Sequence, residues 1–551
     1  MEGGERLSMP HLRDLWIQQL HHFMQSELHL QASDLPTLTD LEAAFRRVKD
    51  HKAVGEDHIP PELCHHFPVS MARWAYSQLL KLCTHGQEAL LHKGGVLVAA
   101  WKKKGPQHLC ESYRSLLISS HVAKSVHRAV RDHQSTIYEA FLQSAQIGGR
   151  KSIPVSLGVH YIRAAARRAK HLSRSHALVF LDLREAFYRV LRPISVGGHI
   201  PDSLLATVAA RLHLPADALA DLQALLQLPS GTSMAGLPRH MCRALQALHT
   251  NTHFKMMTQT DRVHTLIGSR PGDPFADVVF GYMFSRILTI VEKRLGEIGI
   301  LETFEDAEAT GIFVDAANAP IVEHTLLGPT WMDDLCLTLS HQTAAGVESQ
   351  AGVAASILLE TCTAHGVTPN LDRGKSEILF TFRGAGSRKL RVKYFSAANG
   401  QQMPITTEYG TQNISVVGHY THLGSIAHHT GLSHREVRRR IAIGNAAFAT
   451  HRKLLFQNAA FSLQRRAELF QSLVVSKIAY SMESWTFGDN KTFEYFRTAI
   501  LRLYRRLLKL PPDAAIQDAD VLTQASLPDS ASTRGHAPHC EASLSWSSLQ
   551  V

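Results

Sequence analysis

The sequence has few cysteines, and no two of them have the C-x-x-C spacing of a metal-binding motif. Seven cysteines occur in 551 residues. This odd number, without paired spacing, argues against a disulfide framework and against a structural zinc ribbon. We therefore expect a reducing, intracellular location.

Long apolar runs are also missing. The longest, from Val278 to Val291, is interrupted by Arg286 and is shorter than the roughly 20 residues that a membrane span needs. The N-terminus has no apolar segment of the kind found in signal peptides. We expect no membrane association. With 35 glycines and 22 prolines the chain is neither collagen-like nor globally disordered, and its length predicts two to four structural units.

Acidic residues are scarce in four stretches of the chain. The net charge is only +10, so positive charge is concentrated in these stretches rather than spread evenly. Residues 93–131 contain eight Lys and Arg and one acid, and residues 150–174 contain seven and none. Residues 431–466 contain eight and one acid, and residues 497–510 contain five and none. This segregation favours a groove around nucleic acid. The alternative for each stretch is a solvated helix face.

Composition also predicts the ends of the chain. Residues 1–35 are rich in His and Gln, and we expect a loosely attached helical extension at the N-terminus. An amphipathic helix is predicted over 36–50, with Thr39 or Asp40 as its cap. After Pro511 and Pro512 the residues 511–551 are rich in Ser, Ala and Asp, which predicts a poorly packed tail.

A carboxylate ends the apolar run from Ala177 to Leu181. The run is long enough for a fully buried strand, and Asp182 follows it directly. A carboxylate at the end of a core strand is costly unless it is paired or binds a metal. The alternative is that Asp182 caps a following helix.

Two adjacent acids lie between apolar segments in GPTWMDDLCLTL (328–339). This pattern predicts a β-hairpin with Asp333 and Asp334 at its tip. The two carboxylates repel each other unless a cation lies between them and a third ligand, and Mg²⁺ is the cation that prefers oxygen ligands. An ordinary Asp-Asp turn is the alternative.

A glycine-containing loop, GSRPGDP (268–274), precedes an apolar helix-like run from Phe275 to Leu295. Asp273 would cap this helix, and Gly272 would permit a close approach of the backbone to a ligand. With Arg270 beside it, the loop is a candidate contact for a nucleotide or template strand. A capped core helix is the alternative.

Taken in order, FLDLREAF (180–187), GSRPGDP (268–274) and WMDD (331–334) resemble motifs A, B and C of reverse transcriptases, most closely those of non-LTR (LINE-type) retrotransposons. Further segments resemble the same family: KAVGEDHIPPEL (52–63), WKKKG (101–105), SYRSLLISSHVAK (112–124), QIGGR (146–150), PNLDRGKSE (369–377), YTHLG (420–424), SKIAYSMESW (476–485) and LRLYRRLLKLP (501–511). The resemblance thus covers roughly 36–510.

The resemblance implies an α+β fold of the right-hand polymerase type. Fingers and a ferredoxin-like palm, with an antiparallel sheet covered by helices on one face, would occupy 36–425. A helical thumb and following helices would occupy 426–510. The implied activity is RNA-directed DNA synthesis, in which a primer 3′-hydroxyl attacks a deoxynucleoside triphosphate (dNTP) on an RNA template. The implied location is nuclear.

The resemblance also implies roles for individual residues. Asp182, Asp333 and Asp334 would hold two Mg²⁺ ions, or Mn²⁺, and Lys375 would protonate the leaving pyrophosphate. Phe187 matches the steric gate that rejects a ribose 2′-hydroxyl, and a core phenylalanine is its alternative. The remaining implied substrate contacts are Leu183, Arg270 and Gly272. Lys103 and Arg114 match basic finger residues that would contact the triphosphate or the template. Leu423 and Gly424 would contact the primer.

Two positions depart from the family pattern. Pro271 stands where the family usually has Gln, so any contact of that side chain with the nucleotide is lost. Trp331 replaces the more usual Tyr or Phe before the acids. A catalytically inactive, nucleic-acid-binding relic is therefore an alternative function. An intron-maturase-like role is a third, although no separate RNA-binding module supports it.

Overall fold

The computed structural model describes residues 6–24, 30–103, 105–257, 259–307, 321–396, 401–485, 487, 490–511, 516–518 and 520–521. The fold is α+β, and the chain divides into two compact units, Met1–Gly431 and Leu432–Val551. No helix in the described ranges is long and apolar enough to cross a membrane.

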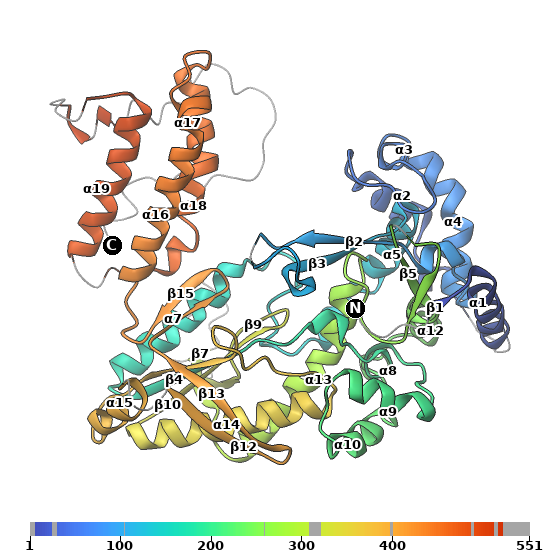
Figure 1. Ribbon diagram of the computed structural model, residues 1–551, viewed down its shortest axis with the longest axis horizontal. Coiled ribbons are helices and arrows are strands. Elements are labelled where there is room, and N and C mark those ends of the chain that lie inside the picture. Colours follow the sequence, from blue (N-terminus) through green and yellow to red (C-terminus); the bar gives the residue numbers. More distant parts are fainter. Residues whose placement is uncertain are drawn as a thin grey trace. The chain divides into compact units, whose positions relative to one another are not determined.

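A six-stranded sheet forms the centre of the first unit (Figure 1), with the strand order β12-β13-β11-β4-β10-β9. β4 pairs antiparallel with both β10 and β11, whereas β11 and β13 are parallel. The sheet is therefore mixed rather than wholly antiparallel as expected. The strand bounds are β4 Ser175–Leu181, β9 Thr330–Trp331, β10 Asp334–His341, β11 Glu377–Thr381, β12 Gln402–Thr407 and β13 Gly410–Val417.

Both faces of this sheet are covered, which explains why every residue of β4 is apolar or buried. Alternate residues such as Val179 join the main core with helices α13 (Ala276–Glu297) and α14 (Ala344–Ala364). The others, Leu178 and Phe180, pack with Ile162 of α7 (Val155–His171) in a separate cluster. The expectation of helices on only one face was wrong.

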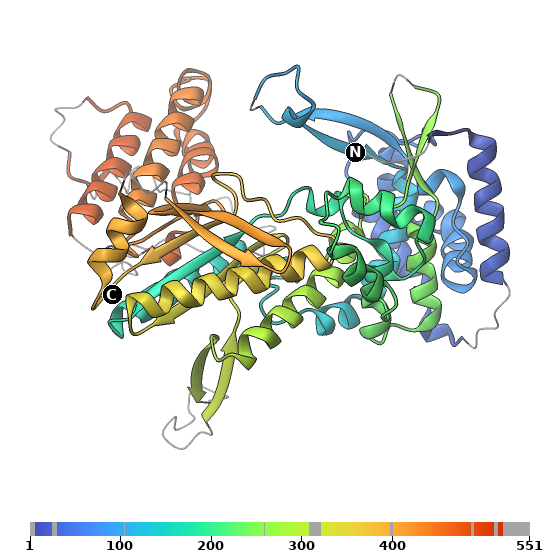
Figure 2. The same ribbon diagram turned by 60° about the horizontal axis from the view of Figure 1, so that its bottom comes forward.

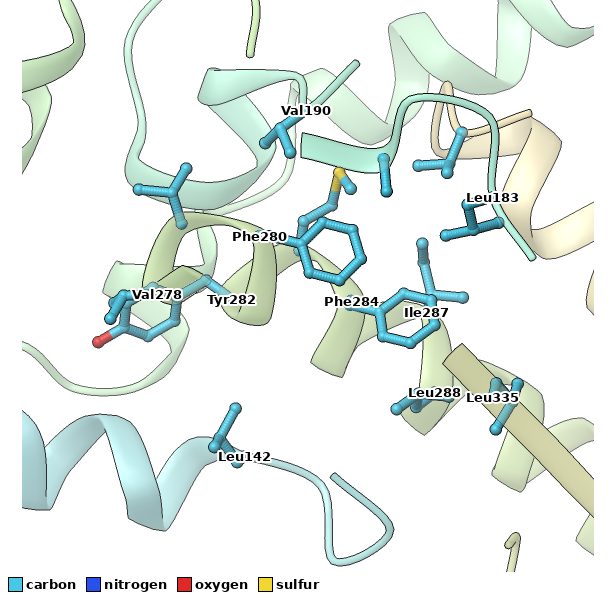
Figure 3. Close-up of a cluster of buried hydrophobic side chains, with 14 of the residues drawn as sticks. Leu142, Leu183, Val190, Val278, Phe280, Tyr282, Phe284, Ile287, Leu288 and Leu335 are labelled. Carbon is cyan, nitrogen blue, oxygen red and sulfur yellow. The ribbon is translucent and has the colours of Figure 1, made fainter. Parts of the chain in front are cut away.

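Helix α13 forms where the apolar run from Phe275 to Leu295 predicted a helix, and it packs against α14. Figure 3 shows Phe280 and Phe284 directed toward Leu183 and Val190, which follow β4. Phe280 and Phe284 stack with their ring centroids 5.1 Å apart. The side chains of α13 therefore share one core cluster with the residues after β4 and with Leu335 at the start of β10.

A second sheet of five strands has the order β1-β6-β5-β2-β3. Its bounds are β1 Arg6–Leu7, β2 Val96–Trp101, β3 Tyr113–Ile118, β5 Thr252–Met256 and β6 Arg262–Thr265. Nearby helices pack on one another, namely α2 Leu38–Arg46, α3 Pro61–His66, α4 Pro68–His85, α5 His121–His133 and α12 Arg239–His249. The cap of α2 is Thr37, with Asp40 completing a capping box, and not Thr39 or Asp40 as predicted.

The N-terminal segment is not a loose extension. β1 pairs with β6, and helix α1 (Met9–Met24) buries Leu12 completely. The Trp16 indole donates a hydrogen bond to the Glu88 carbonyl at 2.6 Å. Strand pairing and this long-range bond hold the segment against the body, and neither can be read from composition.

Short elements connect these parts. They are α6 Ser135–Phe141, α8 Arg192–Val196, α9 Asp202–Arg211, α10 Ala218–Leu226, α11 Gly231–Met234, α15 Ser387–Phe395, β7 Glu302–Ala307, β8 Ile321–Leu326, β14 His419–His422 and β15 Ser425–His428. Figure 2 shows the β7–β8 hairpin projecting from the end of α13.

The second unit is helical, with a core of its own that includes Phe448, Phe456 and Phe470. Its helices are α16 His434–His451, α17 Leu463–Phe470, α18 Ser476–Ile478 and α19 Asn490–Leu507. The unit begins at 432 rather than at the expected 426, because the β14–β15 hairpin belongs to the first unit. Most of the predicted tail, 511–551, lies outside the described residues. Within its described part Asp518 pairs with Arg497 and Arg505, and Val521 is buried.

Candidate active site

Three aspartates lie where β4 and β10 meet at one end. Leu335 pairs with Leu181 in the antiparallel ladder, so the next residues outward are Asp334 on β10 and Asp182 after β4. Asp333 and Met332 form the turn of the β9–β10 hairpin, closed by the pair Trp331 and Asp334. The hairpin predicted from sequence is therefore present, with left-handed backbone at Met332 (φ 57°).

The carboxylates of this cluster disfavour one another's charge. Burial, followed by the charges of Asp333 and Asp182, raises the pKa of Asp334 to about 6. Burial and Asp182 likewise raise the pKa of Asp333. A nearby cation would relieve the repulsion within such a partly buried group of like charges.

One loop, residues 369–376, holds Asp182. The Asn370 amide donates to Asp182 Oδ2 at 3.1 Å, and the Lys375 ammonium lies 3.3 Å from Oδ1. The Ser376 hydroxyl contacts the backbone N of Asp182 at 3.0 Å. This arrangement fixes the carboxylate and gives it one positive neighbour. Asn370 and Ser376 were not predicted, although both belong to the PNLDRGKSE segment.

The side chains fit a divalent cation by their chemistry, because carboxylate oxygens are the ligands that Mg²⁺ and Mn²⁺ prefer. Lys375 and Asn370 engage the two oxygens of Asp182. Among the described residues, no group of three or more His, Cys, Asp or Glu side chains is arranged as a metal-binding cluster.

Leu183 and Phe187 follow Asp182 toward the core. The Leu183 side chain is buried, and its backbone forms a bridge to Pro369. A nucleotide contact predicted for Leu183 can therefore come only from its backbone. Phe187 is half-buried, with its ring centroid 5.1 Å from that of Phe280. One side of this ring is thus a core contact.

The loop of residues 268–274, called the motif B loop below after the motif that it resembles, packs against the five-stranded sheet. The Arg270 guanidinium is buried and donates to the carbonyls of Leu248 (3.0 Å) and His92 (2.8 Å). Gly272 has φ 109°, and a Cβ there would lie 2.8 Å from the Leu117 carbonyl oxygen. Gly272 therefore shapes the contact of the loop with β3, whereas Arg270 also lines a neighbouring cavity, and its Nε has no hydrogen-bond partner among the described residues.

Asp273 is not the cap of α13. The cap position is Phe275, whose N–H donates to Asp273 Oδ1 at 3.0 Å. The second oxygen of Asp273 lies 2.7 Å from Nδ1 of the buried His127. Burial of this aspartate is compensated by ion pairing, which single-residue capping rules do not foresee.

The predicted basic contacts lie on the five-stranded sheet rather than beside the acids. Arg114 is exposed on β3, and Lys103 is exposed just after β2 with φ 56°. Trp101 at the end of β2 is 41% exposed. The structure thus provides a strand pair with basic and aromatic side chains on its surface. Lys104 lies outside the described residues.

Leu423 and Gly424 form the two-residue turn between β14 and β15, with φ 47° and 73°. A Cβ at Gly158 of α7 would lie 2.8 Å from Leu423 Cδ1 and 3.7 Å from Pro329 Cβ. The turn therefore lies close to the segment that enters the β9–β10 hairpin. In the β14–β15 hairpin, the Tyr420 ring stacks on the Phe180 ring with their centroids 4.1 Å apart. The Tyr420 hydroxyl donates to the Lys375 carbonyl at 2.6 Å.

The QIGGR segment supports the outer edge of the β9–β10 hairpin. The N–H groups of Ile147 and Gly148 donate to the Thr330 carbonyl at 3.0 and 3.1 Å. A Cβ at Gly148 would lie 2.6 Å from the Met332 N. This supporting role was not predicted, although the adjacent glycines indicate a close backbone approach.

A cavity of about 110 Å³ lies between the five-stranded sheet and the residues that follow β4. Its lining includes Ser115 and Leu117 of β3, Tyr188, and Gly268 and Pro271 of the motif B loop. The Tyr188 hydroxyl contacts the Ser115 hydroxyl at 2.8 Å and its carbonyl at 2.9 Å. Pro271 thus contributes to the wall of this cavity.

No protein-family model matches the chain, and the search of curated proteins finds no match.

Proposed function

We propose that this chain is an RNA-directed DNA polymerase of the non-LTR retrotransposon type. The observation that carries the proposal is the convergence of Asp182 with Asp333 and Asp334 at the end of two paired antiparallel strands. These aspartates are 151 positions apart in sequence (333 − 182). Polymerase chemistry needs carboxylates from two neighbouring strands to hold two metal ions.

In this proposal the six-stranded sheet and its helices are the palm. The five-stranded sheet with α2 to α5 corresponds to the fingers, and the helical second unit corresponds to the thumb. The sequence order of the motifs and the strand pairing of β4 with β10 support this correspondence.

The acids would hold Mg²⁺ or Mn²⁺, with Asp182, Asp333 and Asp334 as ligands. When bound, the ions would acidify the primer hydroxyl and neutralise charge on the leaving pyrophosphate. Lys375 keeps Asp182 paired in their absence and is the candidate donor of a proton to pyrophosphate. Asn370 and Ser376 orient Asp182 throughout.

Surfaces around the site suit the proposed partners. Lys103 and Arg114 would contact template phosphate, with Trp101 as a surface on which a base stacks. Phe187 would exclude ribonucleotides, and the turn Leu423-Gly424 would contact the DNA primer. A polymerase that copies RNA onto chromosomal DNA would act in the nucleus.

One observation favours the alternative, an inactive protein that still binds nucleic acid. Pro271 lines the cavity and offers no donor, and both terminal nitrogens of Arg270 donate to carbonyls of the protein. A nucleotide would then be held by fewer polar contacts than in the family.

Primer extension with purified protein distinguishes the two functions. The proposal predicts dNTP incorporation opposite an RNA template with Mg²⁺ or Mn²⁺, and little incorporation of ribonucleotides. Salt-dependent binding of primer–template without any incorporation would instead favour the alternative.

A further inference from the structure

A buried histidine joins two carboxylates that are distant in sequence. His127 of α5 lies with Nδ1 2.7 Å from Asp273 Oδ2, and its Nε2 bonds to Glu88 Oε1. The His127 side chain is 0% exposed and each carboxylate is 3% exposed. A carboxylate only accepts hydrogen bonds, so both ring nitrogens must donate and the ring is an imidazolium.

The charges around this ring are consistent with that state. Burial lowers the pKa of His127, but Asp273 and Glu88 outweigh it and raise the pKa to about 9. Arg270 lies 3.9 Å from Asp273, and the Lys93 ammonium donates to the Thr250 carbonyl at 2.9 Å. His92, Lys124 and His249 are further titratable neighbours of this group. Removing His127 would leave two carboxylates without their direct partner, which is costly in a buried site.

Each carboxylate belongs to a different part of the unit. Asp273 is in the motif B loop, two residues after Pro271 and one after Gly272, which packs against Leu117. Pro271 and Leu117 both line the cavity of about 110 Å³. Glu88 follows α4, and its carbonyl accepts the bond from Trp16 of α1. His127 therefore fastens one wall of the cavity to the helical layer behind it.

We propose that His127 is a positioning residue that holds the motif B loop, and hence the cavity wall at Pro271, in the geometry that a nucleotide meets. The nucleotide in this inference rests on the proposed function, whereas the attachment of the loop by His127 is independent of that function. A proline cannot hold the nucleotide by a side-chain hydrogen bond, so the position of the loop backbone carries more of the recognition. Displacements of about 1 Å in such a wall can cost about 100-fold in rate.

Two measurements on the full chain test this role. The first is hydrogen–deuterium exchange of peptides covering 266–276, in wild type and in His127→Gln. The second is the KM for dNTP in primer extension. His365→Gln is the matched control, because His365 is also buried but its ring bonds to the Thr361 carbonyl, at 2.7 Å, rather than to two carboxylates. Asp273→Asn is a milder second variant if His127→Gln does not fold.

We expect faster exchange confined to 266–276 and to the peptides around Glu88, with KM raised about tenfold or more and kcat changed much less. His365→Gln should change neither the local exchange nor KM. Unchanged exchange at 266–276, a uniform increase across the unit, or an unchanged KM in active variants would overturn the role. Wild type that incorporates no nucleotide overturns the proposed function, and exchange alone then decides whether His127 holds the loop.

Discussion

The ammonium of Lys375 lies 3.3 Å from Oδ1 of Asp182, so the acid expected to bind metal carries its own internal cation. Lys375 is half-exposed, and the pair therefore adds at most about 1 kcal/mol to stability. Its position matters more for chemistry. In the proposed reaction Lys375 must leave Asp182 before it can donate a proton.

Lys375→Ala is expected to slow single-nucleotide incorporation by roughly 100-fold, because a positioned proton donor is lost. Its unfolding free energy should change by less than about 1 kcal/mol. Rapid-quench kinetics and urea unfolding measure these two effects. Lys389→Ala, an exposed lysine of α15, is the control. A Lys375→Ala rate equal to that of wild type would remove Lys375 from the reaction.

Asp334→Asn is expected to stabilise the fold when divalent ions are absent. The raised pKa of Asp334, about 6, means that the folded chain holds this proton more tightly than the unfolded chain. Ionisation therefore costs stability as pH rises from about 4 through about 6. Above that window the variant should be more stable by roughly 1–2 kcal/mol.

Urea unfolding at pH 3.5 and pH 7.5 checks this effect, since the gain should vanish at the lower pH. Asp372→Asn serves as the control, because Asp372 is 71% exposed and pairs with Arg184. A loss of stability in Asp334→Asn at pH 7.5 would mean that the three carboxylates do not repel one another.

Stability should also depend on pH through His127. Its pKa is raised to about 9, so its contribution is complete below about pH 6.5 and is lost as pH rises through about 9. Burial lowers the pKa of the neighbouring Lys93 to about 8, which acts in the opposite direction. The difference in unfolding free energy between wild type and His127→Gln isolates the histidine. It should be roughly 2–4 kcal/mol at pH 7 and shrink by pH 10. A difference that is constant from pH 6 to pH 10 would exclude a charged ring.

Gly272→Ala tests the contact between the motif B loop and β3. The new Cβ would lie 2.8 Å from the Leu117 carbonyl oxygen at a backbone φ of 109°, and we expect a loss of about 2–4 kcal/mol in urea unfolding. Gly236→Ala has a positive φ of 72° but no atom within 4 Å, and should lose only about 1 kcal/mol. Equal losses would show that the loop does not press on β3.

Local sequence patterns predicted the parts of this structure that depend on one segment. The apolar run before Asp182, the hairpin around Asp333 and the helix from Phe275 follow from periodicity and turn chemistry. Composition did not reveal the attachment of the N-terminus, because that depends on pairing of β1 with β6.

Roles that depend on distant partners were harder to predict. Arg270 and Gly272 look accessible in a glycine-containing loop, yet the carbonyls of Leu248 and His92 and the backbone of β3 occupy them. The link from His127 to Glu88 and Asp273 spans 39 and 146 positions, and no motif indicates it. Buried ion pairs of this kind become visible only when the packing of α5 against the loop is known.

The central claim is that Asp182, Asp333 and Asp334 act together as one catalytic centre. Single-turnover incorporation of one dNTP on an RNA template, with Mg²⁺, tests it most directly in wild type, Asp182→Asn, Asp333→Asn and the control Asp372→Asn. We expect wild type and Asp372→Asn to incorporate the nucleotide. The incorporation rate of Asp182→Asn and Asp333→Asn should fall by at least about 1,000-fold. Incorporation by Asp182→Asn or Asp333→Asn at the wild-type rate would contradict it.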